Sequence, residues 1–529
     1  TWYNYNGNGY SNYFIIEFAP TDAPVTFNQA FCDSVELKST PIKTADTQGF
    51  SEITWTDSDG DTITELEYFT FYADSDVTLH GTFVRSDGQT CEISSTTYSF
   101  DVFSSPNLVV TNYSGTADLL GGDTIVLVAT TDAGTVSWVD SAGTVTNNDT
   151  LLVTQPGIYT AKAATANCES FEDVQVYEPI YVAKTGDNTT GDGSFANPFL
   201  TIQHGIDEAS EGQKIYVLPG TYSEGELDFE TSSGSGVYKN VYIASDLVRL
   251  DDSSAIASTK IDADGDGYLF NINGANSSTI QGFTLTGVVL SGYSSSVIAL
   301  YNSANVVFRD IIMSGNTNTT GGVRGGAISV SNASPEFDNI TIQGFGSSSS
   351  GLYATAFIEG SASNVLFTDV IWRNNYSTEY GIVNAWSNSS ITLTNNVLVD
   401  NYHGSWRGIL NLHSYSTMVL INTTVVNNLA SEAQLVSFWS SNNKLTLINS
   451  ILGTSTKPEY QIYNNGQSGN SVYARNSVLP LGVTGSNQAS SITWDVDATN
   501  IISDPQLNTD GTLKATSPAI GIATKNPVT

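Results

Sequence analysis

The sequence predicts an all-β chain in which two small β-sandwich modules precede a long parallel β-solenoid. Three observations support this prediction. Only 13% of the 529 residues are charged, whereas glycine alone accounts for 46 of them, a composition typical of many short strands joined by turns. One pattern of strands, tryptophan and cysteine occurs twice in the first third of the chain. A second pattern, with a period of about 27 residues, runs through the second half.

The charge of the chain excludes one class of partner. The formal net charge is −35, with only 18 lysines and arginines, so the phosphates of DNA or RNA would be repelled. No apolar run approaches the roughly 18 residues that a membrane-spanning helix needs. Acidity spread along the whole chain is typical of extracellular surfaces, and we expect the protein outside the cell or on the outer cell surface.

The first third of the chain contains an internal repeat. The segment CDSVELK, which begins at Cys32, aligns with GDTIVLV, which begins at Gly122. Both segments alternate apolar and polar residues as strands do. Further along, Trp55 in EITWTD aligns with Trp138 in VSWVD. The repeat therefore predicts two related modules of similar strand order.

Short strands around one tryptophan, with a cysteine near each end, resemble the Ig-like modules strung along bacterial cell-surface proteins. The closing strands of the two copies end at Cys91 and Cys168, and Gly122 stands where the first copy has Cys32. The resemblance thus implies a disulfide between Cys32 and Cys91 and a free Cys168; three buried reduced thiols are the alternative. It also implies Ig-like β-sandwich domains over residues 1–104 and 105–178.

Five triplets of Asp, Ser or Thr, and an aliphatic residue also lie in the first third. They resemble the O-glycosylation signal of Bacteroidota envelope proteins, and strand-initiating turns explain them equally well. With the Ig-like modules, they indicate a cell-surface protein of the type IX secreted kind. The candidate hydroxyl groups belong to Ser34, Thr62, Thr124, Ser141 and Thr150.

Residues 181–222 form the most specific segment, YVAKTGDNTTGDGSFANPFLTIQHGIDEASEGQKIYVLPGTY. It resembles the opening of right-handed parallel β-helix proteins of the pectate-lyase-like superfamily, with their N-P-F-x-T-I-Q turn, short helix and G-x-x-I-x-V-x-P-G-x-Y strand. The resemblance implies such a β-helix over residues 179–529. Independently, Ile202, Ile206 and Ala209 form an apolar stripe. We expect this helix to cap the stack, whose open end exposes unpaired strand edges.

The repeat in the second half places a small polar residue among apolar ones at intervals of 28, 29, 30, 26, 27, 27 and 27 residues. This period predicts one coil per repeat, so that equivalent side chains stack about 4.8 Å apart. Asn and Gly tolerate the left-handed backbone that coil corners need. We interpret these positions as a structural ladder, made of Gly282, Asp310, Asn339, Asp369, Asn395, Asn422, Asn449 and Asn476.

A second polar column follows six residues after some of these positions, at Asn316, Asn375, Asn401 and Asn428. We interpret this column as structural too. An inward carboxylate at Asp310 or Asp369 would be costly to bury without partners. We therefore expect both carboxylates to accept backbone N–H bonds at a corner.

Enzymes of the resembling superfamily cleave acidic polysaccharides with clustered carboxylates. Here Asp310 and Asp369 are two coils apart with Asn339 between them, and no Asp-Asp pair with a nearby His-Gly and Arg-x-Lys occurs. We predict no catalytic residue and no required cofactor. The expected protein is an adhesin-like binder of a glycan, a polysaccharide or another envelope component. A calcium-dependent polysaccharide lyase and a structural subunit of a surface assembly are the alternatives.

Aromatic and basic residues after residue 369 carry the binding hypothesis. Several aromatic residues recur at equal offsets from the ladder, which predicts a flat platform for sugar rings. Ladders of rings that merely seal the coils are the alternative. The candidate contact residues are Arg373, Tyr376, Tyr380, Trp386, Tyr402, Trp406, Arg407, His413 and Trp439.

One further segment, IDADGDGYLF, begins like a calcium loop. Asp262, Asp264 and Asp266 are followed by Gly267 in the D-x-D-x-D-G pattern. The twelfth position of the loop is Asn273, where calcium loops carry a bidentate Glu. A calcium ion at the three aspartates and a turn without metal are therefore both open.

Overall fold

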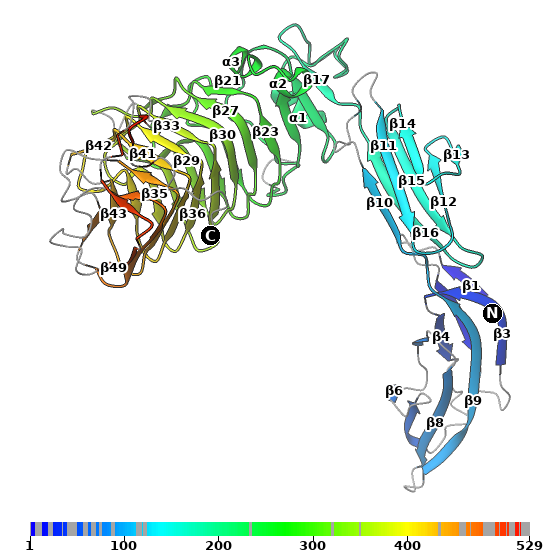
Figure 1. Cartoon of the computed structure of the whole chain (residues 1–529). Coiled ribbons are helices and arrows are strands. Elements are labelled where there is room, and N and C mark those ends of the chain that lie inside the picture. Colours follow the sequence, from blue (N-terminus) through cyan, green and yellow to red (C-terminus); the bar gives the residue numbers. More distant parts are fainter. Residues whose placement is uncertain are drawn as a thin grey trace. The chain divides into compact units, whose positions relative to one another are not determined.

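The computed structural model describes residues 2–5, 13–18, 25–33, 35–39, 50–56, 62–64, 70–73, 77–85, 90–112, 119, 124–231, 235–318, 322–348, 351–431, 435–453, 462–465, 467–479, 492–496, 498–503, 505–506, 514–517 and 519. The chain divides into two compact units, Thr1–Glu178 and Pro179–Thr529. Both units are built almost entirely from strands (Figure 1). Over the described residues, no helix is long and apolar enough to cross a membrane.

The first unit begins with a four-stranded and a five-stranded sheet. The four-stranded sheet has the order β1 (Trp2–Tyr5), β2 (Tyr13–Phe18), β4 (Val35–Ser39), β7 (Thr70–Ala73). The five-stranded sheet has the order β3 (Val25–Cys32), β9 (Thr90–Phe103), β8 (Val77–Arg85), β5 (Phe50–Thr56), β6 (Thr62–Thr64).

Two further sheets of this unit enclose a separate core. The three-stranded sheet has the order β10 (Leu108–Asn112), β11 (Ile125–Thr131), β14 (Thr150–Val153), and the four-stranded sheet the order β13 (Val145–Thr146), β12 (Thr135–Asp140), β15 (Gly157–Ala164), β16 (Glu169–Val176). Leu127 from the first sheet and Trp138 and Ala161 from the second are buried in one cluster. The indole of Trp138 donates to the carbonyl of Asp149 at 3.2 Å, which satisfies its N–H inside the core.

The disulfide of this unit joins Cys32 to Cys168, with Cα atoms 5.6 Å apart, so the predicted bridge between Cys32 and Cys91 is wrong. Cys32 ends β3 and pairs with Phe103, the last residue of β9. Cys91 is the second residue of that 14-residue strand. The twelve residues from there to Phe103 span about 40 Å of strand, whereas a disulfide needs Cα atoms within about 7 Å.

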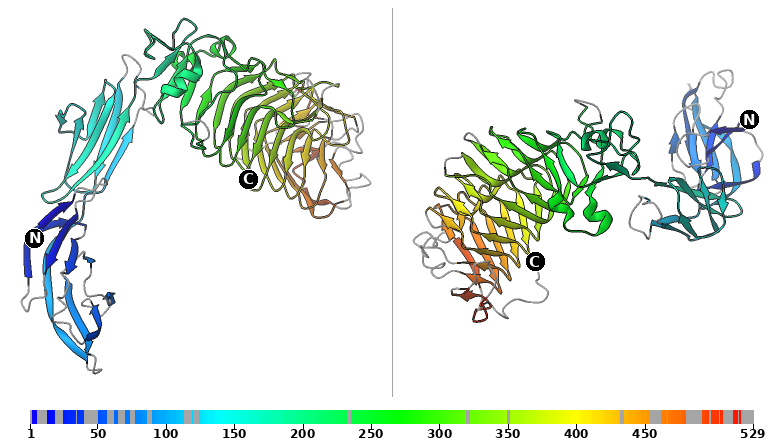
Figure 2. Two further views of the ribbon diagram at one scale, coloured as in Figure 1. Left: turned by 180° about the vertical axis from the view of Figure 1, so that it is seen from behind. Right: turned by 90° about the horizontal axis from the view of Figure 1, so that it is seen from above.

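The second unit is a parallel β-helix whose strands stack coil on coil (Figure 2). Its largest sheet has 21 strands in chain order: β17 (Ile180–Val182), β18 (Lys214–Val217), β19 (Gly220–Ser223), β20 (Tyr242–Ser245), β21 (Thr259–Asp262), β23 (Thr279–Gln281), β24 (Thr284–Thr286), β27 (Val307–Met313), β30 (Glu336–Gln343), β32 (Asn364–Thr368), β33 (Ile371–Arg373), β36 (Ser390–Thr394), β37 (Val397–Val399), β40 (Thr417–Ile421), β41 (Thr424–Val426), β44 (Lys444–Ile448), β45 (Ile451–Leu452), β47 (Asn470–Arg475), β48 (Val478–Leu479), β49 (Ile492–Val496) and β50 (Ile501–Ile502).

Smaller sheets complete the coils. An eight-stranded sheet has the order β22 (Tyr268–Asn273), β26 (Ser296–Tyr301), β29 (Val323–Ser331), β31 (Leu352–Glu359), β35 (Gly381–Trp386), β39 (Leu410–Leu412), β43 (Val436–Phe438), β46 (Ile462–Asn464). A three-stranded sheet contains β34 (Tyr376–Ser377), β38 (Tyr402–His403) and β42 (Leu429–Ala430), and a two-stranded sheet contains β25 (Val289–Leu290) and β28 (Thr317–Asn318).

Identical residue types stack along the inside of the β-helix. Leu420 pairs with Leu393 of the preceding coil and with Leu447 of the following one. The ring of Phe337 lies 5.5 Å from that of Phe308 and 5.0 Å from that of Phe367, in both cases nearly parallel. These side chains belong to one apolar core that extends through the stack. Burial of this continuous core is the main favourable term in the stability of a solenoid.

The small polar residues of the repeat all have a left-handed backbone. Their φ angles are 90° at Gly282 and between 49° and 57° at the other seven positions. Asn422 donates to the side-chain oxygen of Asn395 on the preceding coil at 3.1 Å, and Asn339 donates to Asp310 at 2.6 Å. Asparagine is favoured at these corners because it tolerates positive φ and its amide bonds to the neighbouring coil.

The two aspartates of this ladder differ from the expectation. Asp310 is half-buried and accepts bonds from the side-chain amides of Gln281 and Asn339, at 2.7 and 2.6 Å, rather than from backbone N–H groups. Asp369 is exposed. The left-handed corner directs both carboxylates outward, so neither needs the backbone partners that an inward carboxylate would require.

The second asparagine column points into the stack. Asn375, Asn401 and Asn428 are between 1% and 2% exposed. The side-chain oxygen of Asn401 accepts from the backbone N–H of Asn375 at 3.1 Å, and that of Asn428 accepts from the backbone N–H of Asn401 at 3.0 Å. Each amide thus satisfies polar groups of the neighbouring coil inside the core.

Three short helices flank the first coils: α1 (Ile202–Glu208), α2 (Asp246–Leu250) and α3 (Ala255–Ser258). The hydroxyl of Thr201 caps α1 by accepting from the N–H of His204. Ile202 and Ile206 of α1, and Ala209 beyond it, are buried in the core of the β-helix. The apolar stripe therefore packs against the stack.

Candidate functional site

Aromatic side chains line the outer face of the eight-stranded sheet. Ile358, Ala385, Leu412 and Phe438 of successive strands are buried in the core, so the residue that follows each of them points outward. Those outward residues, with their neighbours, form what we call the aromatic belt: Tyr293, Tyr353, Phe357, Tyr380, Trp386, His413, Trp439 and Tyr463.

Rings of the belt pack on one another from coil to coil. The imidazole of His413 stacks on the indole of Trp386 with centroids 3.7 Å apart and planes 9° from parallel. Tyr380 meets Trp386 edge-on at 5.3 Å, and Phe357 lies 6.0 Å from it. Trp386 is therefore largely covered by its neighbours, whereas Trp406 is 65% exposed.

Arg407 lies at the centre of the belt. Its guanidinium carbon is 4.4 Å from the ring centroid of Tyr380, 5.0 Å from that of Trp439 and 5.8 Å from that of Trp386. Cation–π contacts of this kind contribute about 0.5–2 kcal/mol each, more when water is excluded. Within the described residues, Arg407 forms no ion pair and no hydrogen bond, although the carboxylate of Glu379 is near enough to raise its pKa; its Nη1 is buried without a partner.

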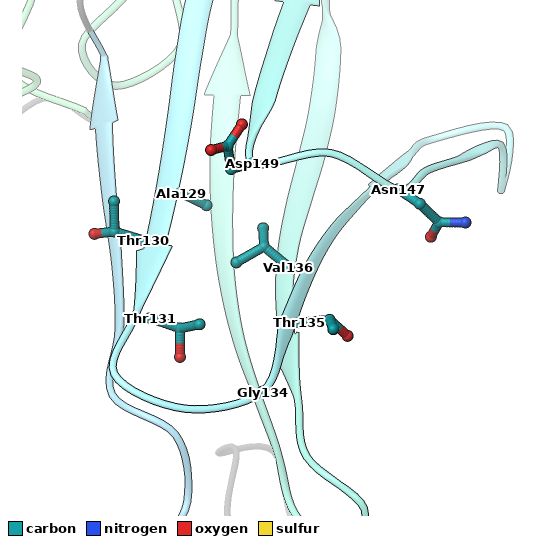
Figure 3. Close-up of a pocket in the computed structure, with 8 residues that line it drawn as sticks. All are labelled: Ala129, Thr130, Thr131, Gly134, Thr135, Val136, Asn147 and Asp149. Atoms are coloured by element: carbon teal, nitrogen blue, oxygen red, sulfur yellow. The ribbon is translucent and has the colours of Figure 1, made fainter.

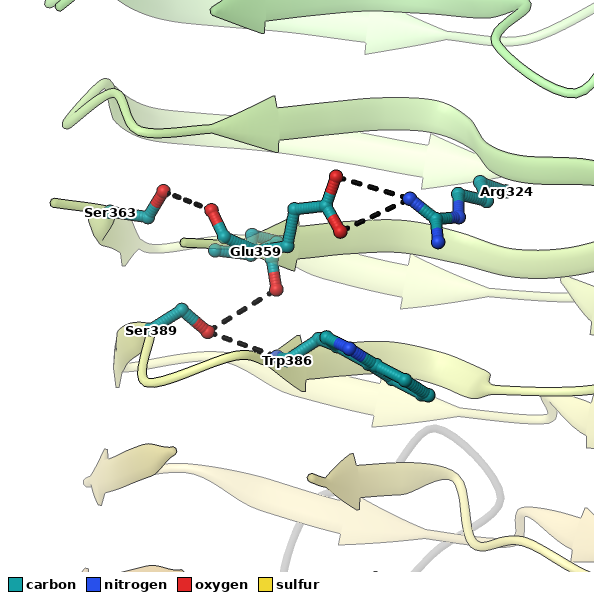
Figure 4. A network of polar contacts seen from close by, with 6 residues as sticks. Arg324, Glu359, Ser363, Trp386 and Ser389 are labelled. Atoms are coloured by element: carbon teal, nitrogen blue, oxygen red, sulfur yellow. Dashed lines mark hydrogen bonds and ion pairs between the residues drawn. The ribbon is translucent and has the colours of Figure 1, made fainter. Parts of the chain in front are cut away.

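A second arginine of the same face has a carboxylate. Arg324 lies 4.6 Å from the ring of Tyr293 and 4.7 Å from that of Phe357. Its Nη1 is 3.1 Å from both carboxylate oxygens of Glu359. Figure 4 shows this pair, with Trp386 on the next strand. The charge of Arg324 is thus neutralised within the β-helix.

Beneath the rings lies a polar column that faces outward and yet is fully buried. Asn384, Asn411 and Ser437 are all 0% exposed. Asn411 donates to the side-chain oxygen of Asn384 at 2.6 Å, and Ser437 donates to that of Asn411 at 2.7 Å. Among the residues that the structure describes, the amide nitrogen of Asn384 has no partner. An unsatisfied buried donor lowers the stability of the fold by about 1–3 kcal/mol. The unpaired amide of Asn384 is therefore unfavourable for folding.

The histidines of this region add no positive charge to that of Arg407. Burial lowers the pKa of His413 to about 4 and that of His403 to about 3, and the positive charge of Arg407 acts in the same direction. Burial also lowers the pKa of Arg407, whereas Tyr380 and Glu379 raise it. Both imidazoles are therefore neutral at pH 7, while a guanidinium keeps its proton.

The candidate contact residues fall into separate places. Five of them meet in the belt: Tyr380, Trp386, Arg407, His413 and Trp439. Tyr376 and Tyr402 stack with centroids 4.7 Å apart on the three-stranded sheet. Arg373 is exposed on β33 of the 21-stranded sheet and donates to Gln343 at 2.8 Å. The equal offsets in the sequence thus do not place all nine side chains on one platform.

A carboxylate cluster on the 21-stranded sheet contains a residue that the sequence analysis missed. Asp338 pairs in register with Arg309, and their side chains are 3.6 Å apart. Burial raises the pKa of Asp338, and the positive charge of Arg309 lowers it. The negative charges of Asp369, Asp310 and Glu336 raise it further. Asp338 directly precedes the ladder residue Asn339, so examining the residues beside each ladder position would have found it.

Two of the three aspartates of the calcium-like loop already have backbone partners. Asp262 accepts from the N–H of Asp264 at 2.9 Å, and Asp266 accepts from the N–H of Glu226 at 3.2 Å. In the described part of the chain, no three acidic, histidine or cysteine side chains come together closely enough to hold a metal ion.

The first unit has a hollow of about 720 Å³ between β11, β12 and the segment before β14 (Figure 3). Asp149 is the one titratable side chain among the residues that line it. Of the candidate glycosylation positions, Thr124 and Ser141 are exposed, and Thr150 bonds to Asp149 at 3.0 Å. Thr62 begins β6, and Ser34 lies outside the described residues.

No protein-family model matches the sequence, and no curated protein matches it. Among solved structures, a rhamnogalacturonan lyase is similar at 11% identity, over 66% of this chain and 97% of that chain, with a TM-score of 0.28. The catalytic domain of a GH87 α-1,3-glucanase is similar at 12% identity, over 88% and 89%, with a TM-score of 0.25. An amphioxus IgVJ-C2 molecule is similar at 16% identity, over 29% and 99%, with a TM-score of 0.14. With scores this low, the fold is established by the strand pairing of the chain itself.

Proposed function

We propose that the protein binds a glycan on the aromatic belt, without cleaving it. The observation that carries this proposal is Arg407, whose guanidinium is held among three rings and lacks an acceptor within the described residues. Sugars are bound by apolar ring faces together with a few polar groups that fix orientation. The indole of Trp406, next to Arg407 in sequence, supplies a ring that is largely open to solvent, since the residue is 65% exposed.

The features of the rest of the chain are consistent with a protein that is displayed on the outside of the cell. We propose that residues 1–104 and 105–178 are Ig-like spacer modules, and that the protein is secreted to the surface of a bacterium of the Bacteroidota by the type IX route. The net charge of −35 supports a surface exposed to solvent. We further propose that α1 caps the first coil, because its apolar stripe is buried against the stack.

A glycan array tests the binding function. Full-length protein is expected to bind a defined set of glycans, and Trp406→Ala is expected to lower that binding by about tenfold, since one aromatic contact contributes about 1–1.5 kcal/mol. The matched control is Tyr473→Ala, an aromatic residue stacked under Arg475 on the 21-stranded sheet. Equal binding by wild type and Trp406→Ala would contradict the proposed site.

A second candidate, calcium-dependent cleavage of a polysaccharide, is favoured by Asp338. Burial raises the pKa of its carboxyl group, the direction that favours a proton donor, and Arg309 lies beside it. The test incubates the protein with pectate and alginate, with and without added calcium, and follows ultraviolet absorbance for unsaturated ends. Activity that disappears in Asp338→Asn would establish cleavage. Neither binding nor cleavage would favour the third function, a structural subunit of a surface assembly.

A further inference from the structure

We propose that Arg407 is the receptor for a carboxylate group of the ligand, and that the bound glycan carries one isolated sugar acid rather than a run of acidic sugars. This inference rests on the proposed glycan-binding function. It assigns a chemical class to the ligand and a specific role to one side chain.

The comparison of two arginines within the same face supports the carboxylate. Arg324 and Arg407 are both held over aromatic rings on the outside of the eight-stranded sheet. Arg324 is paired with Glu359, whose two oxygens are 3.1 Å from its Nη1, while its Nε is buried without a partner among the described residues. Arg407 forms no such ion pair among the described residues, although Glu379 acts on it electrostatically. A guanidinium offers five N–H donors in a planar fork that matches a carboxylate, so an external carboxylate would do at Arg407 what Glu359 does at Arg324.

A second, independent observation lies in the polar column that Gly408 contacts. Asn384 is 0% exposed and its amide nitrogen has no partner among the described residues, although its oxygen is bonded to Asn411. The residue after Arg407, Gly408, donates its N–H to Ser437 of the same polar column at 2.9 Å. The indole N–H of Trp439, whose ring lies against Arg407, is also buried without a partner in the described part of the chain. Besides Nη1 of Arg407, two buried donors of this region thus lack acceptors among the described residues, and an acceptor-rich group would satisfy such donors.

The charge around Arg407 limits how many carboxylates a bound ligand can carry without being repelled. Within the described residues, the arginines held over belt rings are Arg324 and Arg407, and the charge of Arg324 is already neutralised. His413 is neutral at pH 7 because of its lowered pKa, and the chain as a whole has a net charge of −35. A polyanion would place its other carboxylates in this negative field and be repelled. One acid on an otherwise neutral glycan avoids that repulsion.

Isothermal titration of the full-length protein tests the inference with five probes at fixed ionic strength. These are a trisaccharide of lactose capped by one N-acetylneuraminate, a trisaccharide capped by one glucuronate, the methyl ester of each, and tetragalacturonate. We expect at least one singly acidic trisaccharide to bind about tenfold more tightly than its methyl ester. We also expect Arg407→Lys to remove that tenfold difference, because lysine lacks the planar fork. Arg475→Lys is the matched control, since Arg475 also lies over a ring and pairs with Asp495.

The outcomes separate this inference from the function on which it rests. If glycans bind and methylation changes nothing, the carboxylate receptor is wrong while glycan binding stands. Tighter binding of tetragalacturonate than of both capped trisaccharides overturns the single-acid part. If no glycan binds at all, the proposed function fails, and acetate is the direct probe of Arg407. An acetate-induced shift of the side-chain N–H signal that is missing in the Arg407→Lys spectrum supports the receptor, and no shift overturns it.

Discussion

Replacing asparagine by glycine at Asn401 and, in a second variant, at Asn422 compares what the inward asparagine column and the corner ladder each contribute to stability. Asn401 is 1% exposed, and its side chain makes four bonds. Its oxygen accepts from the backbone N–H and from the amide of Asn375, at 3.1 and 3.0 Å. Its amide donates to the carbonyl of Trp372 at 2.8 Å and to Asn428 at 2.9 Å. Asn401→Gly removes all four bonds from the interior of the stack.

The expected loss follows from the groups that remain. The backbone N–H of Asn375 and the carbonyl of Trp372 lose the side-chain partner that Asn401 provides, at about 1.5 kcal/mol for each buried polar group. Asn401→Gly should therefore lower the free energy of unfolding by about 3 kcal/mol. Asn422→Gly is the matched control, because Asn422 has a φ of 51° and an exposed amide bond. Glycine adopts that backbone without strain, so the control should change stability by only about 0.5 kcal/mol.

Urea unfolding of the full-length variants, followed by far-ultraviolet circular dichroism, measures both free energies. The two substitutions remove the same side chain from equivalent coils, so the denatured states are comparable. A difference of less than about 1 kcal/mol between the variants would refute the reasoning, because the buried amide bonds would then contribute no more than exposed ones.

Three further predictions concern the disulfide, pH and the belt. Cys168→Ser should abolish the cross-linked peptide found by non-reducing mass mapping, whereas Cys91→Ser should leave it intact; the reverse result would restore the other pairing. Because the pKa of His413 is lowered to about 4, the unfolded chain binds more protons below pH 6.5, and this residue contributes stability that is lost as the pH falls from 6.5 towards 4. His413→Gln should therefore lose less stability than wild type over that interval in thermal unfolding, and parallel curves would contradict this. Glu359→Ala should lower stability by about 1–2 kcal/mol, because its ion pair is 27% and 28% exposed. Asp338→Ala should lower stability by under about 0.5 kcal/mol, because the side chains of its ion pair with Arg309 are 45% and 41% exposed. Equal losses of stability for the two variants in denaturant unfolding would show that burial does not make one ion pair stronger than the other.

Local requirements of the backbone made the coils of this protein predictable. A corner with positive φ favours Asn or Gly whatever surrounds it, so the interval from Asn395 to Asn422 already contains the length of one coil. The same holds for Ile202 and Ile206, since a helix of this period must bury its apolar stripe. These features depend on residues close in sequence, and periodicity alone detects them.

Tertiary structure decided what lies between the corners. Trp386 and Trp439 stand at the same offset from their ladder positions, and the strand register does make them equivalent. His413 occupies the equivalent position on the coil between them, where its offset is one residue longer, and its imidazole lies against Trp386. In the same way, Arg407 rather than Trp406 lies over Tyr380. The pairing of Cys32 with Cys168 depends on which end of a 14-residue strand each cysteine approaches. Such contacts depend on loop lengths and long-range register, which no local preference of the backbone encodes.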